Sequence, residues 1–238
     1  MRTILIIIFL GLYGIVTLPL LLAIYIIGFF SKKKQYAWCK GFTACLCRGI
    51  MFLTGSTIDI TGYENIPDET VLFVGNHRSI FDIVTLLFII NRPFGFVGKA
   101  EVTKWPYVNM VLSMLGGLFI DRSDNRKALK TILEGIALLK SGHSLLIFPE
   151  GTRNKKSTEP LPFKQGSLKL ADKANVPIVP FSIRGTDDVF ENNSFLNIKR
   201  SNIKVNFGKP VLLSTLASED RKKSGSYVRD LVIQLLHK

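Results

Sequence analysis

Residues 71–90 read VLFVGNHRSIFDIVTLLFII, and this stretch decides the fold class that the sequence predicts. Val71 to Val74 is short, continuous and apolar, which is typical of an interior strand in a parallel sheet. Ile80 to Ile90 is a longer apolar run and predicts a buried helix. The polar residues between the two runs would then follow the carboxyl end of a strand, where open α/β sheets gather their ligands.

Strand and helix patterns continue to alternate on either side of this stretch. Further strands are predicted at residues 57–60, 94–98, 118–120, 145–148, 177–183 and 203–207. Helices are predicted at residues 129–139, 167–174 and 227–236. This alternation predicts an α/β fold with a mostly parallel sheet flanked by helices. The polar residues 154–160 predict an exposed loop.

The N-terminal segment has a different character, since residues 3–30 contain no charged side chain. A bilayer core requires about 20 apolar helical residues, so the segment predicts membrane association. Lys32, Lys33 and Lys34 follow at once, which predicts that the remainder of the chain lies on the cytoplasmic side. Pro19 interrupts the segment. A helix that spans the bilayer and a helix pair within one leaflet therefore both stay open.

A second amphipathic helix is predicted directly after the lysines. Its apolar residues are Trp38, Phe42, Leu46, Ile50 and Phe52, interleaved with basic ones. Such a helix is typical of a membrane interface. The sequence thus predicts membrane-associated helices over residues 1–53 and an α/β domain over residues 54–238.

The composition and charge of the chain limit which classes of partner and cofactor we expect. The 238 residues are 47% hydrophobic, enough for a sizeable core, and carry a formal net charge of +13, which favours an anionic partner. Nucleic acid also suits this charge, but no basic-aromatic binding motif supports it, so we expect no nucleic acid partner. Cys39, Cys45 and Cys47 form no CxxC pair and have no histidine nearby, which argues against disulfides and zinc. No P-loop, GxGxxG or HExxH occurs, and no metal or organic cofactor is expected.

Four polar clusters follow predicted strands. They are Asn76-His77-Arg78 with Asp82, Lys99 with Glu101, Asp121-Arg122, and Glu150-Gly151-Thr152-Arg153. In the first, a histidine can take a proton near neutral pH while a carboxylate orients its ring. A structural alternative exists, because Ser79 and Asp82 also fit the N-cap and third position of a helix. Likewise, Gly151 alone indicates only a turn.

Three of these clusters, followed by an apolar run, resemble in order the sequence blocks of the glycerolipid acyltransferase family. The first block is Asn-His-x-x-x-x-Asp, present as Asn76 to Asp82. The other three are Gly116 to Arg122, Phe148 to Arg153 as Phe-Pro-Glu-Gly-Thr-Arg, and Val176 to Pro180. The resemblance covers roughly residues 57–207. Asn154 departs from it, since the family often has serine there.

The resemblance implies transfer of a fatty acyl group from a thioester to the free hydroxyl of 1-acylglycerol 3-phosphate, giving phosphatidic acid. It assigns His77 as general base and Asp82 as the residue that orients it. For substrate binding it implies Arg122 and Arg153 at the acceptor phosphate, Glu150 and Gly151 at the glycerol part, and Thr152 beside them. Lys99 is a further cationic candidate for the phosphate. Direct attack needs no acyl-enzyme, which agrees with the lack of a Gly-x-Ser-x-Gly elbow. The only co-substrate is the thioester, carried by coenzyme A or by acyl carrier protein.

Several alternatives stay open at this stage. The acceptor could be glycerol 3-phosphate or another lysophospholipid, or the protein could be a membrane-bound thioesterase or a non-catalytic lipid-binding module. Arg78 could contact the acyl donor or be structural. The expected partners are the lysophospholipid, the thioester or its carrier protein, and an anionic membrane surface. Backbone N–H groups near the helix start after Ser79 would stabilise the oxyanion.

Overall fold

The structure is a computed structural model that describes residues 1–121, 123–194 and 197–238. The chain forms two compact units. The first comprises residues 1–59, 78–93 and 184–203, and the second comprises residues 60–77, 94–183 and 204–238. The boundary between them passes through the first polar cluster, between His77 and Arg78.

The described residues form a seven-stranded sheet in the order β1-β7-β6-β2-β5-β3-β4. The strands are β1 (Thr57–Thr61), β2 (Leu72–Gly75), β3 (Phe94–Lys99), β4 (Leu118–Ile120), β5 (Ser144–Ile147), β6 (Ile178–Arg184) and β7 (Asn202–Phe207). Every pairing from β6 to β4 is parallel. The prediction of an α/β fold with a mostly parallel sheet is therefore confirmed.

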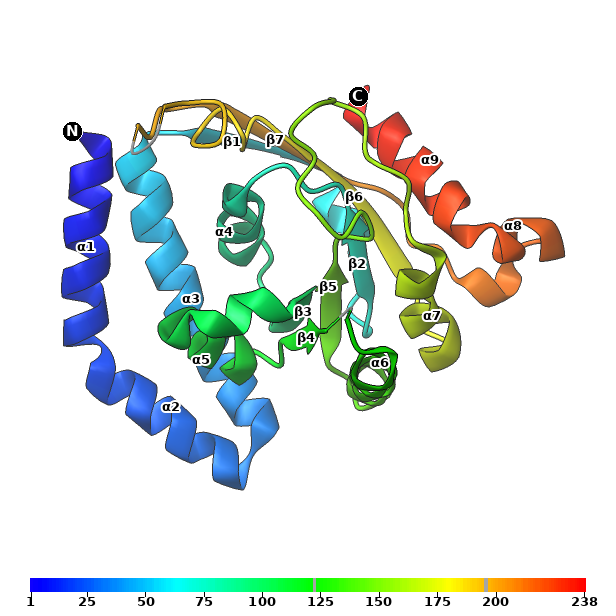
Figure 1. The fold of residues 1–238 in the computed structure, drawn as a ribbon, viewed down its shortest axis with the longest axis horizontal. Coiled ribbons are helices and arrows are strands. Elements are labelled where there is room, and N and C mark those ends of the chain that lie inside the picture. Colours follow the sequence, from blue (N-terminus) through cyan, green and yellow to red (C-terminus); the bar gives the residue numbers. More distant parts are fainter. Residues whose placement is uncertain (122, 195–196) are drawn as a thin grey trace. The chain divides into compact units, whose positions relative to one another are not determined.

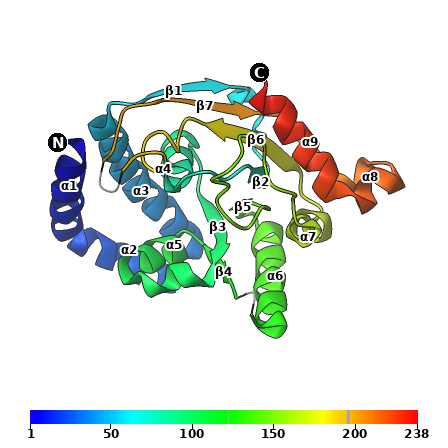
Figure 2. The ribbon, with the colours of Figure 1, turned by 45° about the horizontal axis from the view of Figure 1, so that its top comes forward.

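Three helices of the second unit lie along one side of these strands (Figures 1 and 2). They are α6 (Asn125–Lys140), α7 (Gln165–Ala174) and α9 (Ser224–Leu236). Leu139 of α6, Leu168 of α7 and Val228 of α9 are buried in one cluster with Leu145 and Ile178 of the sheet. Burial of this apolar surface is what holds the helices to the strands.

The shorter elements of the second unit include one helix that the sequence analysis did not predict, α5 (Pro106–Met114). Proline is favoured in the first turn of a helix, and Pro106 is the signal that could have identified it. The other short helices are η1 (Tyr63–Asn65), η2 (Ala100–Lys104), η3 (Leu213–Thr215) and α8 (Ser218–Lys222).

The register of the sheet determines where the polar clusters of the second unit lie. Val74 near the end of β2 pairs with Ile147 of β5. It also pairs with Pro180 of β6 on the other side. Because the strands are parallel, the residues that follow β2 and β5 leave the sheet at the same edge.

The first unit contains the N-terminal helices α1 (Arg2–Val16), α2 (Leu18–Phe30) and α3 (Lys32–Thr54), together with α4 (Ile80–Ile89). The chain bends by 56° between α1 and α2, with Pro19 in the first turn of α2. Among the described helices, none alone combines the length and apolar composition of a membrane span, whereas this bent pair together does. In α3, Phe42 and Ile50 are buried and Trp38 and Phe52 are exposed.

Packing inside the first unit explains why α4 belongs with the N-terminal helices. The buried Lys40 of α3 donates from Nζ to the carbonyl oxygen of Leu87 near the end of α4. Phe9 of α1 lies against Gly49 of α3, where a Cβ atom would come within 2.2 Å of the ring. The N-terminal helices therefore share their compact unit with α4 and residues 184–203. The division into membrane-associated helices over residues 1–53 and an α/β domain over residues 54–238 stays a prediction.

Candidate active site

His77 follows β2 by two residues, and its main chain is held from both sides within the second unit. Its N–H donates to Oε1 of Glu150 at 2.7 Å. Its carbonyl oxygen accepts from the N–H of Asn154 at 2.8 Å. The imidazole stacks on the ring of Phe148, with centroids 4.1 Å apart and planes 11° from parallel. Both the backbone and the ring plane of His77 are thus defined by the segment that follows β5.

Glu150 is a buried carboxylate with 4% of its surface exposed. Besides the bond to His77, its Oε2 accepts from the N–H of Leu161 at 2.9 Å. Gly151 turns the chain at φ +71°, a conformation that favours glycine, and its N–H donates to the carbonyl oxygen of Phe148 at 3.0 Å. The two hydrogen bonds to the Glu150 carboxylate are charge-assisted, and such bonds are stronger than neutral ones. Glu150 therefore ties two main-chain segments together at the sheet edge.

The loop that begins at Asn154 is organised by that residue. Its Oδ1 accepts from the N–H groups of Lys156 at 3.1 Å and Ser157 at 3.2 Å, and its Nδ2 donates to the carbonyl oxygen of Glu159 at 2.6 Å. Lys155 to Glu159 are exposed, as predicted, whereas Asn154 and Pro160 at the two ends of the predicted loop are buried. Thr152 and Arg153, which directly precede it, are exposed.

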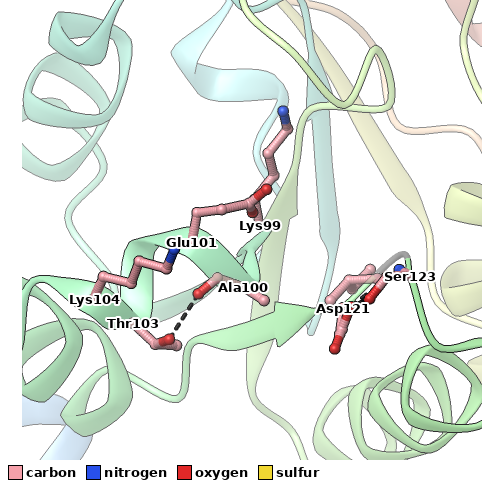
Figure 3. Close-up of a pocket in the computed structure, with 8 residues that line it drawn as sticks. Lys99, Ala100, Glu101, Thr103, Lys104, Asp121 and Ser123 are labelled. Atoms are coloured by element: carbon pink, nitrogen blue, oxygen red, sulfur yellow. Dashed lines mark hydrogen bonds between the residues drawn. The ribbon is translucent and has the colours of Figure 1, made fainter.

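A cleft of about 490 Å³ lies between the ends of β3 and β4, also within the second unit. Figure 3 shows Lys99, Glu101 and Lys104 along one side, with Asp121 and Ser123 along the other. Hydrogen bonds from the hydroxyl and N–H of Ser123 hold the pKa of Asp121 below its ordinary value. The cleft therefore presents cations and carboxylates together.

The structure separates the predicted substrate-binding residues of the second unit into two groups. Among the described residues, Lys99 belongs to the cleft. Glu150, Gly151, Thr152 and Arg153 belong to the segment around His77. Arg122 lies outside the described residues, although its neighbours Asp121 and Ser123 line the cleft.

Asp82 belongs to the first unit and is completely buried at the start of α4. Its Oδ2 accepts from the N–H groups of Arg78 at 2.7 Å and Ser79 at 2.9 Å. The Ser79 hydroxyl oxygen in turn accepts from the N–H of Phe81, and the two side chains form a capping box. The helix-cap interpretation of Ser79 and Asp82 is confirmed. The orienting role of Asp82 stays a prediction.

Arg78 makes a close ion pair in the first unit. Its Nε and Nη2 both donate to Oδ2 of Asp187, at 2.9 and 2.5 Å. Burial alone would raise the pKa of Asp187, but the hydrogen bonds and the positive charge from Arg78 outweigh burial and lower it. These contacts support the structural alternative for Arg78.

Sequence reasoning missed the residues that surround the first block. Asn154 stood out only as a departure from a family pattern, and the stacking of Phe148 on His77 gave no local signal. Thr186, Asp187 and Glu191, which contact the start of α4, are more than 100 positions away along the chain. Contacts between such distant positions depend on the fold and leave no spacing pattern in a single sequence.

Comparison with known proteins agrees with the placement of these blocks. Residues 57–184 match the family model described as Acyltransferase. The chain is 32% identical over 189 residues to the 1-acyl-sn-glycerol-3-phosphate acyltransferase of Borreliella burgdorferi, covering 78% of this chain and 74% of that protein. It is 33% identical to a chloroplastic 1-acyl-sn-glycerol-3-phosphate acyltransferase of Arabidopsis thaliana, covering 76% of this chain and 52% of that one.

A solved structure is similar over the whole length. It is the crystal structure of the 1-acyl-sn-glycerophosphate acyltransferase PlsC from Thermotoga maritima, with a TM-score of 0.74 and 27% sequence identity. The match covers 100% of this chain and 99% of that one. The family match includes the first three blocks, from Asn76 to Arg153, and the fourth block up to Pro180.

Proposed function

Because this chain belongs to the acyltransferase family, we propose that it transfers a fatty acyl group from a thioester to the free hydroxyl of 1-acylglycerol 3-phosphate, forming phosphatidic acid. The similar proteins from Borreliella burgdorferi, Arabidopsis thaliana and Thermotoga maritima are all named as acyltransferases of this acceptor. The observation that carries the proposal is the intact first block, whose His77 is held by the segment of the third block.

In this proposal His77 is the general base. Its imidazole takes the proton of the acceptor hydroxyl while that oxygen attacks the thioester carbonyl. The tetrahedral intermediate collapses, the carbon–sulfur bond breaks, and the thiol leaves with a proton returned by the imidazolium. A positioned base contributes about 10²–10⁴-fold to such a step. Asp82, five positions further along the chain, would orient and stabilise the imidazolium.

Cationic side chains would bind the acceptor phosphate. Arg153 suits this task because a guanidinium can give two parallel hydrogen bonds to phosphate oxygens. Lys99 in the cleft is a second candidate, and Arg122 is a third by its position in the sequence block.

For Glu150 the contacts support a role other than the predicted seating of glycerol. Both carboxylate oxygens accept main-chain hydrogen bonds, one from His77 and one from Leu161. We assign Glu150 as a positioning residue that fixes the backbone of the general base. Gly151 allows the turn that positions Glu150, and Thr152, which follows Gly151, is exposed.

The N-terminal helices would hold the enzyme at its lipid substrate. Exposed apolar side chains cover α1 and α2, including Ile8, Leu12, Ile15, Leu22 and Phe29. In water these side chains would remain hydrated, whereas a bilayer would bury them. Lys32 to Lys34 then favour a cytoplasmic location for the rest of the chain, and the net charge of +13 favours an anionic surface.

A panel of acceptors tests the proposal. Purified protein in anionic vesicles is incubated with acyl-CoA or acyl carrier protein thioester and with 1-acylglycerol 3-phosphate, glycerol 3-phosphate, a neutral lysolipid or no acceptor. The proposal expects phosphatidic acid by mass spectrometry with 1-acylglycerol 3-phosphate as the preferred acceptor. Free fatty acid released equally with and without acceptor would instead identify a thioesterase.

A further inference from the structure

The segment that follows β6, residues 185–194, makes a set of side-chain contacts with the start of α4 inside the first unit. We refer to it as the post-β6 segment. Its Thr186 donates from Oγ1 to Oδ1 of Asp82 at 2.5 Å, and both residues are completely buried. Buried polar groups of this kind need a partner, because an unpaired one costs free energy.

Two more side chains of the post-β6 segment reach the same helix start. Asp187 pairs with Arg78. Glu191 accepts from the Ser79 hydroxyl at 2.5 Å through Oε2 and from the Ile80 N–H at 2.9 Å through Oε1. The first N–H groups of a helix have no partner within the helix, and a carboxylate there also complements the helix dipole.

The backbone of the post-β6 segment requires a glycine where it leaves β6. Gly185 has φ +83°, and a Cβ atom there would lie 2.4 Å from the carbonyl oxygen of Asn202. This turn directly precedes Thr186. The backbone conformation of Gly185, which other residues adopt only with strain, therefore sets the position of the Thr186 hydroxyl.

The hydrogen bonds of Asp82 show what Thr186 adds. Oδ2 is fixed by the N–H groups of Arg78 and Ser79, which belong to the same turn of chain. Oδ1 accepts from Thr186, a residue 104 positions away. The hydroxyl therefore fixes the plane of the carboxylate, and with it the direction in which the remaining lone pairs point.

We infer that Thr186 is a positioning residue for acyl transfer, which acts by fixing the carboxylate of Asp82, with Asp187 and Glu191 holding the helix start that carries it. This inference rests on the proposed function, in which Asp82 orients His77. Thr186 is not expected to contact either substrate, so its loss should affect the chemical step and leave binding unchanged.

Two substitutions at Thr186 separate its hydroxyl from its volume. Thr186→Val keeps the shape and removes the donor, and Thr186→Ser keeps the donor. We expect Thr186→Val to lower kcat roughly tenfold with KM for both substrates unchanged. Thr186→Ser should restore kcat. Equal kcat values for the two variants would overturn the inference.

Introducing Thr186→Val into an Asp82→Asn variant tests whether Thr186 affects kcat through Asp82. If it does, Thr186→Val causes no further loss of the residual kcat there, so that the two substitutions are not additive. A similar further loss in both backgrounds, together with a lower Tm, would mean that Thr186 only stabilises the fold and would refute the inference. An inactive wild type contradicts the proposed function itself, whereas an active wild type with additive losses contradicts only the role of Thr186.

Discussion

Oε1 of Glu150 accepts a 2.7 Å hydrogen bond from the main-chain N–H of His77, a residue 73 positions earlier in the chain. The parallel pairing of β2 with β5 brings the two motifs to one sheet edge, where Asn154 completes the arrangement at the His77 carbonyl oxygen. If His77 is the general base, as proposed, it must meet its substrate in a narrow range of positions, and a fixed backbone favours the reaction.

Removing the Glu150 carboxylate should therefore reduce both activity and stability. Glu150→Ala leaves the half-buried N–H groups of His77 and Leu161 without their acceptor, which costs about 1–3 kcal/mol of unfolding free energy. We expect a lower kcat with little change in KM, and a smaller effect for Glu150→Gln, which keeps one acceptor oxygen. Glu134→Ala on the exposed face of α6 is the control. A rise in acceptor KM at unchanged kcat and stability would support seating of glycerol instead.

Arg153 is expected to contribute to acceptor binding. Arg153→Ala should raise KM for 1-acylglycerol 3-phosphate roughly tenfold, since hydrogen bonds to charged groups contribute about 1.5–3 kcal/mol, and should change KM for the thioester much less. Lys155→Ala, at an exposed position of the same loop, is the matched control. Steady-state kinetics with each substrate varied in turn measure this, and equal increases in both KM values would argue against a phosphate contact.

The ion pair of Arg78 with Asp187 should make stability depend on pH. The folded state lowers the pKa of Asp187, so its stabilisation is complete above the unfolded pKa of about 4 and is lost as the pH falls through the folded value. We expect Asp187→Asn to be about 1–3 kcal/mol less stable at pH 7, with the difference shrinking below about pH 4. Urea unfolding at pH 7, 5, 4 and 3 measures it, with Asp230→Asn as control. A constant difference down to pH 3 would show that the pair is not the cause.

Charges on the outer face of α1 should weaken membrane binding without disturbing the fold. Ile8 and Ile15 are exposed at 52% and 74%, so replacing both with Asp places the new charges at the surface of the first unit. Sedimentation with anionic vesicles should show less binding, and activity should fall more on membrane-borne acceptor than on a short-chain soluble analogue. Ser226→Asp on α9 controls for the added charge. Unchanged vesicle binding would contradict the proposed membrane role of α1.

Strong periodicity was sufficient to predict most of the fold. The apolar runs before His77 and Glu150 became β2 and β5, and Ile80 to Ile89 became α4, because each is long and uniform enough to allow one assignment. Helix α5 was missed, since its apolar residues give a weak pattern and only Pro106 marks its start.

The candidate site was predictable only where chemistry follows from a local motif. His77, Asp82 and the segment from Glu150 to Arg153 could be selected from their order and spacing. The partners that hold them, Asn154 and Thr186, could not, because hydrogen bonds across 77 and 104 positions arise from strand order rather than from any local pattern.

The most direct test of the central claim is the formation of phosphatidic acid by the His77→Ala variant. The account predicts a folded protein whose kcat is about 10²–10⁴-fold below that of the wild type, while His237→Ala at the exposed end of α9 keeps normal activity. Phosphatidic acid formed by His77→Ala at a rate near that of the wild type would contradict it.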